Sequence, residues 1–155
     1  MSLPTLLNNL RLPIVAAPMF LVSGPDLVVE SCLSGIVGTF PALNQRTTDG
    51  FEQWVVDIKA KIGDKPFGVN LIVHKTNPRL EADLAICVKH KVPLIITSLG
   101  AVKELVDTVH SYGGLVFHDV TNTKHAQKAA GAGVDGLIAV CAGAGGHAGT
   151  MNPFA

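Results

Sequence analysis

Six short apolar runs recur along the chain, separated by longer segments in which apolar and polar residues alternate with a helical period. The runs lie at residues 13–18, 35–40, 67–73, 92–98, 114–120 and 135–141. They are rich in β-branched residues and largely continuous rather than alternating. Strands that are covered on both faces of a parallel sheet have this pattern. The pattern therefore predicts six buried parallel strands.

The segments between the runs carry helix start and stop signals. Pro25 can occupy the first position of a helix that Gly35 ends. Asp49 and Glu52, three residues apart, predict a capping box before a helix that Gly63 ends. Further helical segments lie at residues 79–91, 101–112 and 124–133. The result is a βα unit repeated roughly every 20–30 residues, with no linker to divide it.

Two α/β architectures accept this repeat, the doubly wound sheet and the (β/α)8 TIM barrel. A dinucleotide-binding sheet needs the spacing G-x-G-x-x-G after its first strand, and residues 17–26, "APMFLVSGPD", lack it. The barrel is therefore the first choice. A barrel typically has about 250 residues and eight βα units. We expect residues 1–155 to form a single TIM-barrel domain with about six of the eight units present, truncated before strands seven and eight.

Composition narrows the partner class. The chain has 155 residues, 12 Lys and Arg, 12 Asp and Glu, and a hydrophobic fraction of 48%. Zero formal charge offers no basic face for nucleic acid or an anionic membrane, which favours a small-molecule or protein partner. A homo-oligomer remains open.

Cysteine use and the N-terminal residues bear on localisation. The three cysteines are far apart and form no C-x-x-C pair, which argues against a disulfide scaffold or a structural zinc site and favours a reducing cytoplasm. The chain shows no export-signal pattern at its start and no run of about 18 apolar residues. We expect a cytoplasmic protein without a membrane span.

Reactive residues of parallel βα folds lie at the carboxyl ends of strands. At the end of the first run, Ala17 allows close approach of a planar ligand, Pro18 stiffens the turn and Met19 offers a polarizable thioether. Packing of the barrel mouth explains these residues about as well. In the third run, Asn70 is an amide among apolar neighbours, which must bond either within the protein or to a ligand such as the pyrimidine edge of a flavin.

The fifth run ends with two ionisable residues on opposite faces. If Phe117 points into the barrel, alternation along the strand places Asp119 inside with it and His118 among the helices. Asp119 is then the better site candidate, and His118 is better explained as a structural imidazole. Thr121 or Asn122 could cap the next helix.

The sixth run leads into "CAGAGGHAGT", residues 141–150. Gly145 and Gly146 let the backbone lie against a cofactor, although a glycine loop alone is more often a turn. His147 is the only side chain in the loop that can exchange a proton near neutral pH, and we take it as the catalytic candidate. The other loop and helix histidines are expected at the surface, and no His, Asp or Glu spacing suggests a metal.

Six segments at successive strand ends together resemble the nitronate monooxygenase family, formerly called 2-nitropropane dioxygenases. They are "AAPMF", "GTFPALN", "FGVNL", "ITSLG", "HDVTNTKHA" and "GAGGHAG", and the resemblance extends from Leu12 to Ala155. It implies an FMN-dependent TIM-barrel enzyme that oxidises alkyl nitronates or nitroalkanes with O2 to carbonyl compounds and nitrite.

The resemblance also implies roles for residues. The flavin would contact Ala17, Pro18, Met19 and Asn70, with Gly145 and Gly146 close by. His147 would lie beside flavin and substrate, acting as a base towards neutral nitroalkanes and orienting nitronates. Asp119 is a further cofactor-binding candidate, and since some relatives carry Lys at its position, the charge near the flavin is inverted relative to them. The FMN phosphate would be held largely by loops after strands seven and eight.

Two other functions compete with this one. The first is a flavin-dependent NAD(P)H oxidoreductase on the same barrel, such as an enoyl-ACP reductase or a quinone reductase, which has a similar glycine–histidine loop. The second is a non-catalytic barrel-fragment binding module.

Overall fold

The computed structural model describes residues 5–100, 103–145 and 147–154, and its central element is one parallel sheet. The strands are β1 (Val15–Ala16), β2 (Val37–Pro41), β3 (Phe67–Ile72), β4 (Leu94–Ser98), β5 (Leu115–Val120) and β6 (Gly136–Ala139). Their order in the sheet is β1-β2-β3-β4-β5-β6, and each pairs in parallel with the next. A doubly wound sheet reverses direction at a switch point, whereas a barrel adds strands in chain order. The predicted barrel is confirmed as a half-barrel, part of a (β/α)8 fold.

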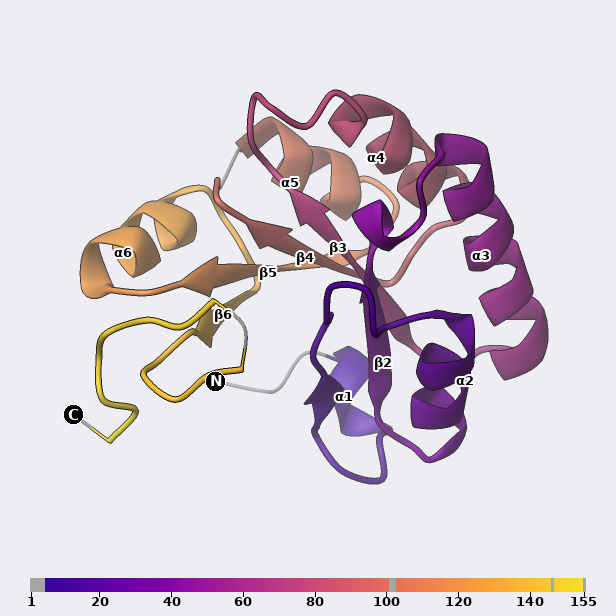
Figure 1. Ribbon diagram of the computed structural model, residues 1–155, viewed down its shortest axis with the longest axis horizontal. Coiled ribbons are helices and arrows are strands. Elements are labelled where there is room, and N and C mark those ends of the chain that lie inside the picture. The colour runs from indigo at the N-terminus through magenta and orange to yellow at the C-terminus, as the bar shows by residue number, and fades with distance from the viewer. Residues whose placement is uncertain (1–4, 101–102, 146, 155) are drawn as a thin grey trace.

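Helices follow the strands and cover one face of the sheet. Figure 1 shows α2 to α6 arranged in an arc around the outside of the sheet. The helical elements are α1 (Thr5–Asn8), α2 (Pro25–Leu33), the 3-10 turn η1 (Ala42–Asn44), α3 (Thr48–Ile62), α4 (Leu80–Lys89), α5 (Lys103–His110) and α6 (Thr123–Gly131). Pro25 opens α2 as predicted, and Gly35 follows its C-cap with a φ of 90°.

The predicted capping box at the start of α3 is wrong. The N-cap is Thr47, whose side chain accepts a hydrogen bond from the Gly50 N–H. The helix therefore begins too early for Glu52 to reach back to the cap. Glu52 instead pairs with Lys89 and His90 at the C-terminal end of α4.

Alternation along the strands divides the apolar side chains into two clusters. On β4, Ile95 joins the larger cluster between sheet and helices, whereas Leu94 and Ile96 point to the opposite face and pack with Val37 of β2. Leucines from α1 and the residues after it pack against this inner cluster. The inner cluster is thus the floor of the barrel, and α1 contributes to it.

Gly38 shows how closely the helical layer approaches the sheet. A Cβ at this position would collide with the backbone of Val28 in α2. Only glycine therefore allows α2 to lie directly on β2.

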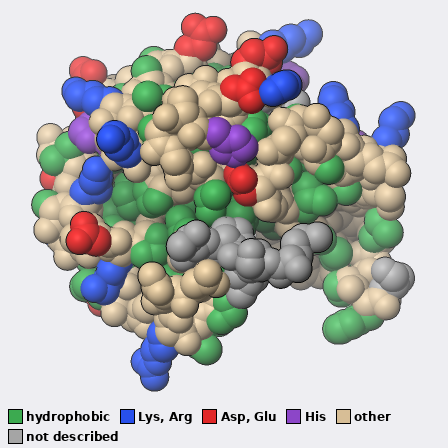
Figure 2. Space-filling model, turned by 180° about the vertical axis from the view of Figure 1, so that it is seen from behind, with side chains coloured by type: hydrophobic (Ala, Val, Ile, Leu, Met, Phe, Trp, Pro, Cys, Tyr) green, Lys and Arg blue, Asp and Glu red, His purple; other side chains and the backbone are tan. Residues whose placement is uncertain are grey.

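Charges on the surface are mixed. Figure 2 shows acidic and basic side chains dispersed over the face seen there, without a large patch of one sign. Among the described helices, none combines the length and apolar character that a membrane crossing requires.

Candidate functional site

A chain of hydrogen bonds crosses the inner face of the half-barrel near the carboxyl ends of three adjacent strands. Asn70 of β3 donates from Nδ2 to Ser98 Oγ of β4 over 2.8 Å. Ser98 Oγ in turn donates to Asp119 Oδ2 of β5 over 2.6 Å. The fold thus brings together two of the predicted site residues, and Ser98 joins them.

The orientation of the Asn70 amide follows from its partners. Its Nδ2 also donates to the Ile96 carbonyl over 3.2 Å, and a carbonyl can only accept. Both N–H groups are therefore used within the protein. No donor among the described residues bonds to Asn70 Oδ1, so the amide oxygen is the group with which Asn70 can receive a ligand.

The predicted orientation of β5 is confirmed. Phe117 packs on the inner cluster and Asp119 bonds to inward-facing Ser98. His118 is buried on the outer face, with Nδ1 2.7 Å from Thr97 Oγ1. Burial raises the pKa of Asp119, while the hydrogen bond from Ser98 and the nearby His118 act in the opposite direction. Burial lowers the pKa of His118, which favours the neutral imidazole of a structural residue.

The loop after β1, residues 17–23, forms one side of the barrel mouth, and we call it the rim loop. Ala17 and Met19 are exposed, and Pro18 is partly buried. Ser23 accepts from the Met19 N–H over 2.9 Å and donates to the Ala17 carbonyl over 3.4 Å. Asn44 of η1 also bonds to this loop from outside it. The predicted ligand-facing turn is therefore a fixed structure with accessible side chains.

The glycine–histidine loop after β6 closes on itself. The Ala142 N–H donates to the Met151 carbonyl over 2.7 Å, and a Cβ at Gly149 would collide with the Val140 carbonyl oxygen. A Cβ at Gly145 would meet none of the described residues within 4 Å. Gly146 lies outside the described residues. His147 is exposed and makes no hydrogen bond or ion pair with any other described residue.

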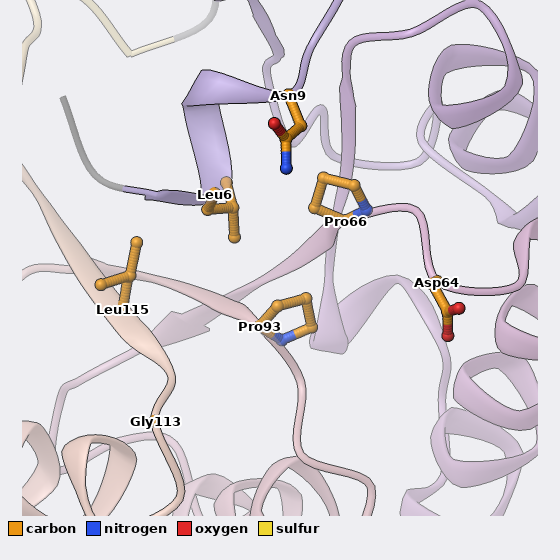
Figure 3. Close-up of a pocket in the computed structure, with 7 residues that line it drawn as sticks. All are labelled: Leu6, Asn9, Asp64, Pro66, Pro93, Gly113 and Leu115. Atoms are coloured by element: carbon orange, nitrogen blue, oxygen red, sulfur yellow. The ribbon is translucent and has the colours of Figure 1, made fainter.

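A cavity of about 410 Å³ lies elsewhere. It is lined by Leu6, Asn9, Asp64, Pro66, Pro93, Gly113 and Leu115 (Figure 3). Pro66 and Pro93 directly precede β3 and β4, and Gly113 lies two residues before β5, so this cavity is at the amino ends of the strands. Active sites of such barrels are built at the carboxyl ends, so the cavity is not the candidate site.

Two residues with clear roles in this geometry were missed from the sequence. Ser98 is polar at an inward position two residues after Ile96, and the same alternation that placed Asp119 could have identified it. Asn44 belongs to the quoted segment "GTFPALN", but nothing local indicates that its amide reaches back to the rim loop. The described residues contain no group of three or more His, Cys, Asp or Glu able to hold a metal ion.

Comparison with known proteins adds relatives by sequence. No protein-family model matches the chain. The chain is 30% identical over 147 residues to the (3aS,4S,5R,7aS)-5-hydroxy-7a-methyl-1-oxo-octahydro-1H-indene-4-carboxyl-CoA dehydrogenase of Rhodococcus jostii (strain RHA1), a match covering 95% of this chain and 40% of that relative. It is 24% identical over 180 residues to a nitronate monooxygenase of Paraburkholderia phytofirmans, covering 92% of this chain and 49% of the relative.

Two solved structures have a fold similar to that of this chain. FabK from Thermotoga maritima superposes with a TM-score of 0.85 at 26% identity, covering 96% of this chain and 46% of FabK. A nitroalkane oxidase from Streptomyces ansochromogenes superposes with a TM-score of 0.83 at 26% identity, covering 95% of this chain and 51% of the oxidase.

Fold and relatives together define a class by architecture, that of the (β/α)8 barrels. Within this class the chain has the fold of the nitronate monooxygenase family, as the resemblance of its strand-end segments implied. The chain spans 40% and 49% of the lengths of the two curated relatives described above.

Proposed function

We propose that the protein is an FMN-dependent enzyme that oxidises alkyl nitronates or nitroalkanes with O2 to carbonyl compounds and nitrite. Its support is the likeness to a nitronate monooxygenase and to a nitroalkane oxidase over most of the chain. The structural observation that carries it is the Asn70 amide, whose two donors are used internally and whose oxygen is left to accept.

The residues present fit a flavin. The pyrimidine edge of the ring has one N–H between two carbonyl groups, and Asn70 Oδ1 is an acceptor suited to that N–H. Exposed Ala17 and Met19, with Pro18, would meet the ring, and the open space around Gly145 leaves room for the cofactor beside that loop. When bound, FMN would supply the electron transfer.

Asp119 would act on the site through Ser98 rather than by direct contact. A Ser98 hydroxyl that donates to Asp119 presents its lone pairs to Asn70, which keeps the Asn70 oxygen turned away from β4. Asp119 would thus help to orient the amide that receives the flavin.

His147 would act on the substrate. It is exposed and free of bonds to other described residues, so its imidazole is available to a ligand in the barrel mouth. With a neutral nitroalkane it would remove the α-proton, and with a nitronate it would orient the anion.

A second candidate function is an NAD(P)H-linked flavin oxidoreductase acting on a thioester substrate. Two relatives, 30% and 28% identical, are named as carboxyl-CoA dehydrogenases, which favours this alternative. A binding module without catalysis is the third candidate.

Anaerobic mixing separates these candidates. We expect propionate 3-nitronate to bleach the absorbance of bound FMN and to yield nitrite when air is admitted, and we expect NADPH to leave the absorbance unchanged. Rapid bleaching by NADPH, together with no nitrite formed from the nitronate, would favour the second candidate. If the full-length protein did not bind FMN, the binding module would be favoured.

Replacement of His147 by Ala tests its role. Because only neutral nitroalkanes need proton removal, kcat/KM for a nitroalkane should fall by about 100-fold or more, and kcat/KM for its nitronate by less than about tenfold. His125→Ala is the matched control, since this exposed imidazole lies at the start of α6. Equal losses for both substrates would contradict the base assignment.

A further inference from the structure

We propose that Asn44 is a positioning residue, which fixes the shape of the rim loop and thereby the surface of residues 17–19 that the flavin ring would meet. The inference rests on the proposed function, because it concerns the same cofactor. It assigns a role to a residue that lies outside the predicted cofactor contacts.

The Asn44 amide gives its donors and its acceptor to one loop. Nδ2 donates to the Met19 carbonyl over 3.0 Å and to the Ser23 carbonyl over 2.9 Å. Oδ1 accepts from the Leu21 N–H over 3.0 Å. The two carbonyls can only accept, so the orientation of the amide is unambiguous. A single side chain therefore binds the rim loop at three points.

Apolar packing does not hold the tip of this loop. Phe20, Leu21 and Val22 are 69%, 78% and 64% exposed. Leu21 also has a φ of 60°, a left-handed conformation that a leucine adopts only when its surroundings impose it. Since its side chain is exposed, what imposes that conformation is the backbone hydrogen bonding, and the Leu21 N–H donates to Asn44.

Asn44 stands on a firm support. It ends η1, directly after β2, where the Gln45 N–H donates to the Ala42 carbonyl. The Gln45 carbonyl accepts from Arg79 Nη1 over 2.6 Å, which ties the same turn to the loop before α4. The amide can therefore transmit the position of the sheet to the rim loop.

Met19 connects the Asn44 hydrogen bonds to the surface that the flavin would meet. Its N–H donates to Ser23 Oγ, and its carbonyl accepts from Asn44 Nδ2 and from the Val22 and Ser23 N–H groups. Loss of the Asn44 bonds would leave this carbonyl only the contacts within the loop itself and let the Met19 thioether move relative to a bound ring. All three of these Asn44 hydrogen bonds go to backbone atoms of the rim loop, so Asn44 would act through residues 17–19 and not on the ligand.

The test uses Asn44→Asp, which keeps size and shape but sets an oxygen against the Met19 and Ser23 carbonyls. Without FMN, chymotrypsin cleavage after Phe20, mapped by mass spectrometry, should become at least about tenfold faster. The loss of two hydrogen bonds is expected to raise the population of the opened, cleavable loop about tenfold. With FMN, the dissociation constant should rise about tenfold and the visible circular dichroism of the bound flavin should change. Asn44→Ala removes these two bonds and also the bond from the Leu21 N–H, without adding a charge, so its effects should be at least as large.

Asn77→Asp is the matched control. Asn77 holds the loop after β3 in a similar way, donating to the Ile72 carbonyl over 3.0 Å and accepting from the Arg79 N–H over 3.1 Å. It should leave cleavage after Phe20 and the flavin spectrum unchanged.

Unchanged cleavage in both Asn44 variants would overturn the claim that Asn44 holds the loop. Faster cleavage with an unchanged flavin spectrum and affinity would overturn its positioning role towards the cofactor. If the unmodified protein failed to bind FMN, the proposed function would fail with that role, and the cleavage rates would still decide whether Asn44 holds the loop.

Discussion

At the scale of single residues, the inner face of the half-barrel depends on Ser98. Its one hydroxyl accepts from Asn70 and donates to Asp119, so it couples an amide to a carboxyl group across three strands. Asp119 is partly buried, and burial raises its pKa. The site therefore holds a carboxyl group for which ionisation is more costly than in water.

Replacement of Asp119 by Asn should reveal this cost. A raised native pKa means that Asp119 contributes stability fully below its unfolded pKa, and this contribution is lost as the pH rises through the native value. We expect the difference in free energy of unfolding between Asp119→Asn and the unmodified protein to be constant below the ordinary pKa of 3.8. As the pH rises above 3.8, this difference should shift in favour of the variant. Urea unfolding at a series of pH values measures the difference.

A difference in free energy of unfolding that does not change with pH would contradict the raised pKa. Ser98→Ala is a useful companion, because it removes the hydrogen bond that lowers the pKa of Asp119. The dependence on pH should then become steeper.

At the scale of elements, the loops at the barrel mouth are joined by α4. Arg79, the N-cap of α4, reaches the Gln45 and Thr47 carbonyls that precede α3. Its guanidinium also pairs with Asp83 one turn on, Nη2 lying 3.0 Å from Oδ2, and Thr48 donates to Asp83 Oδ1. Asp83 is fully buried, and burial raises its pKa although Arg79 opposes the change. The ion pair thus fastens α4 to the start of α3.

Breaking this pair should be far more costly than breaking an exposed one. Asp83→Ala leaves Arg79 largely buried without its partner, and we expect a loss of about 3 kcal/mol in the free energy of unfolding. Asp107→Ala removes an exposed pair of the same i,i+4 spacing on α5, with Lys103 2.8 Å away, and should cost no more than about 0.5 kcal/mol. Chemical denaturation of both variants at one pH measures the contrast, and similar losses would contradict the importance assigned to Asp83.

At the scale of the whole molecule, strand order explains why the site lies where it does. Six strands added in chain order form a curved sheet with helices outside and a polar chain of bonds inside, above an apolar floor. The rim loop, Asn70, Asp119 and the loop of His147 come from the carboxyl ends of β1, β3, β5 and β6. One concave end therefore collects residues that are far apart in the sequence.

Binding of FMN at this end should stabilise the whole molecule. At a concentration of one hundred times the dissociation constant, a ligand of the native state adds about 2.7 kcal/mol. We expect Gly145→Ala to leave the unfolding temperature without FMN unchanged, since a Cβ there meets none of the described residues within 4 Å. The increase in unfolding temperature caused by FMN should be smaller in this variant.

Gly149→Ala is the steric contrast. Its Cβ would collide with the Val140 carbonyl oxygen, so it should lower the unfolding temperature even without FMN. An FMN-induced increase in Gly145→Ala equal to that of the unmodified protein would contradict a close approach of the cofactor to residue 145.

Much of this architecture was determined by the sequence alone. Continuous apolar runs predicted the six strands, and alternation predicted that Asp119 points inward and His118 outward, because both are local consequences of backbone geometry. Asn122, one of the two predicted candidates, caps α6, since capping also depends on adjacent residues. The start of α3 was predicted wrongly, because Thr47 and the Asp49–Glu52 pair compete locally and Glu52 has better partners in α4.

Only the tertiary structure decided the contacts between distant residues. Ser98 meets Asn70 and Asp119 across 28 and 21 positions of the chain, and Asn44 meets the rim loop across 21 to 25. Such pairs arise from sheet register and loop closure, which no local pattern encodes. The sequence therefore determined which residue types lie at the strand ends. Folding decided which of them form hydrogen bonds, because a hydrogen bond requires a distance that only three-dimensional packing sets.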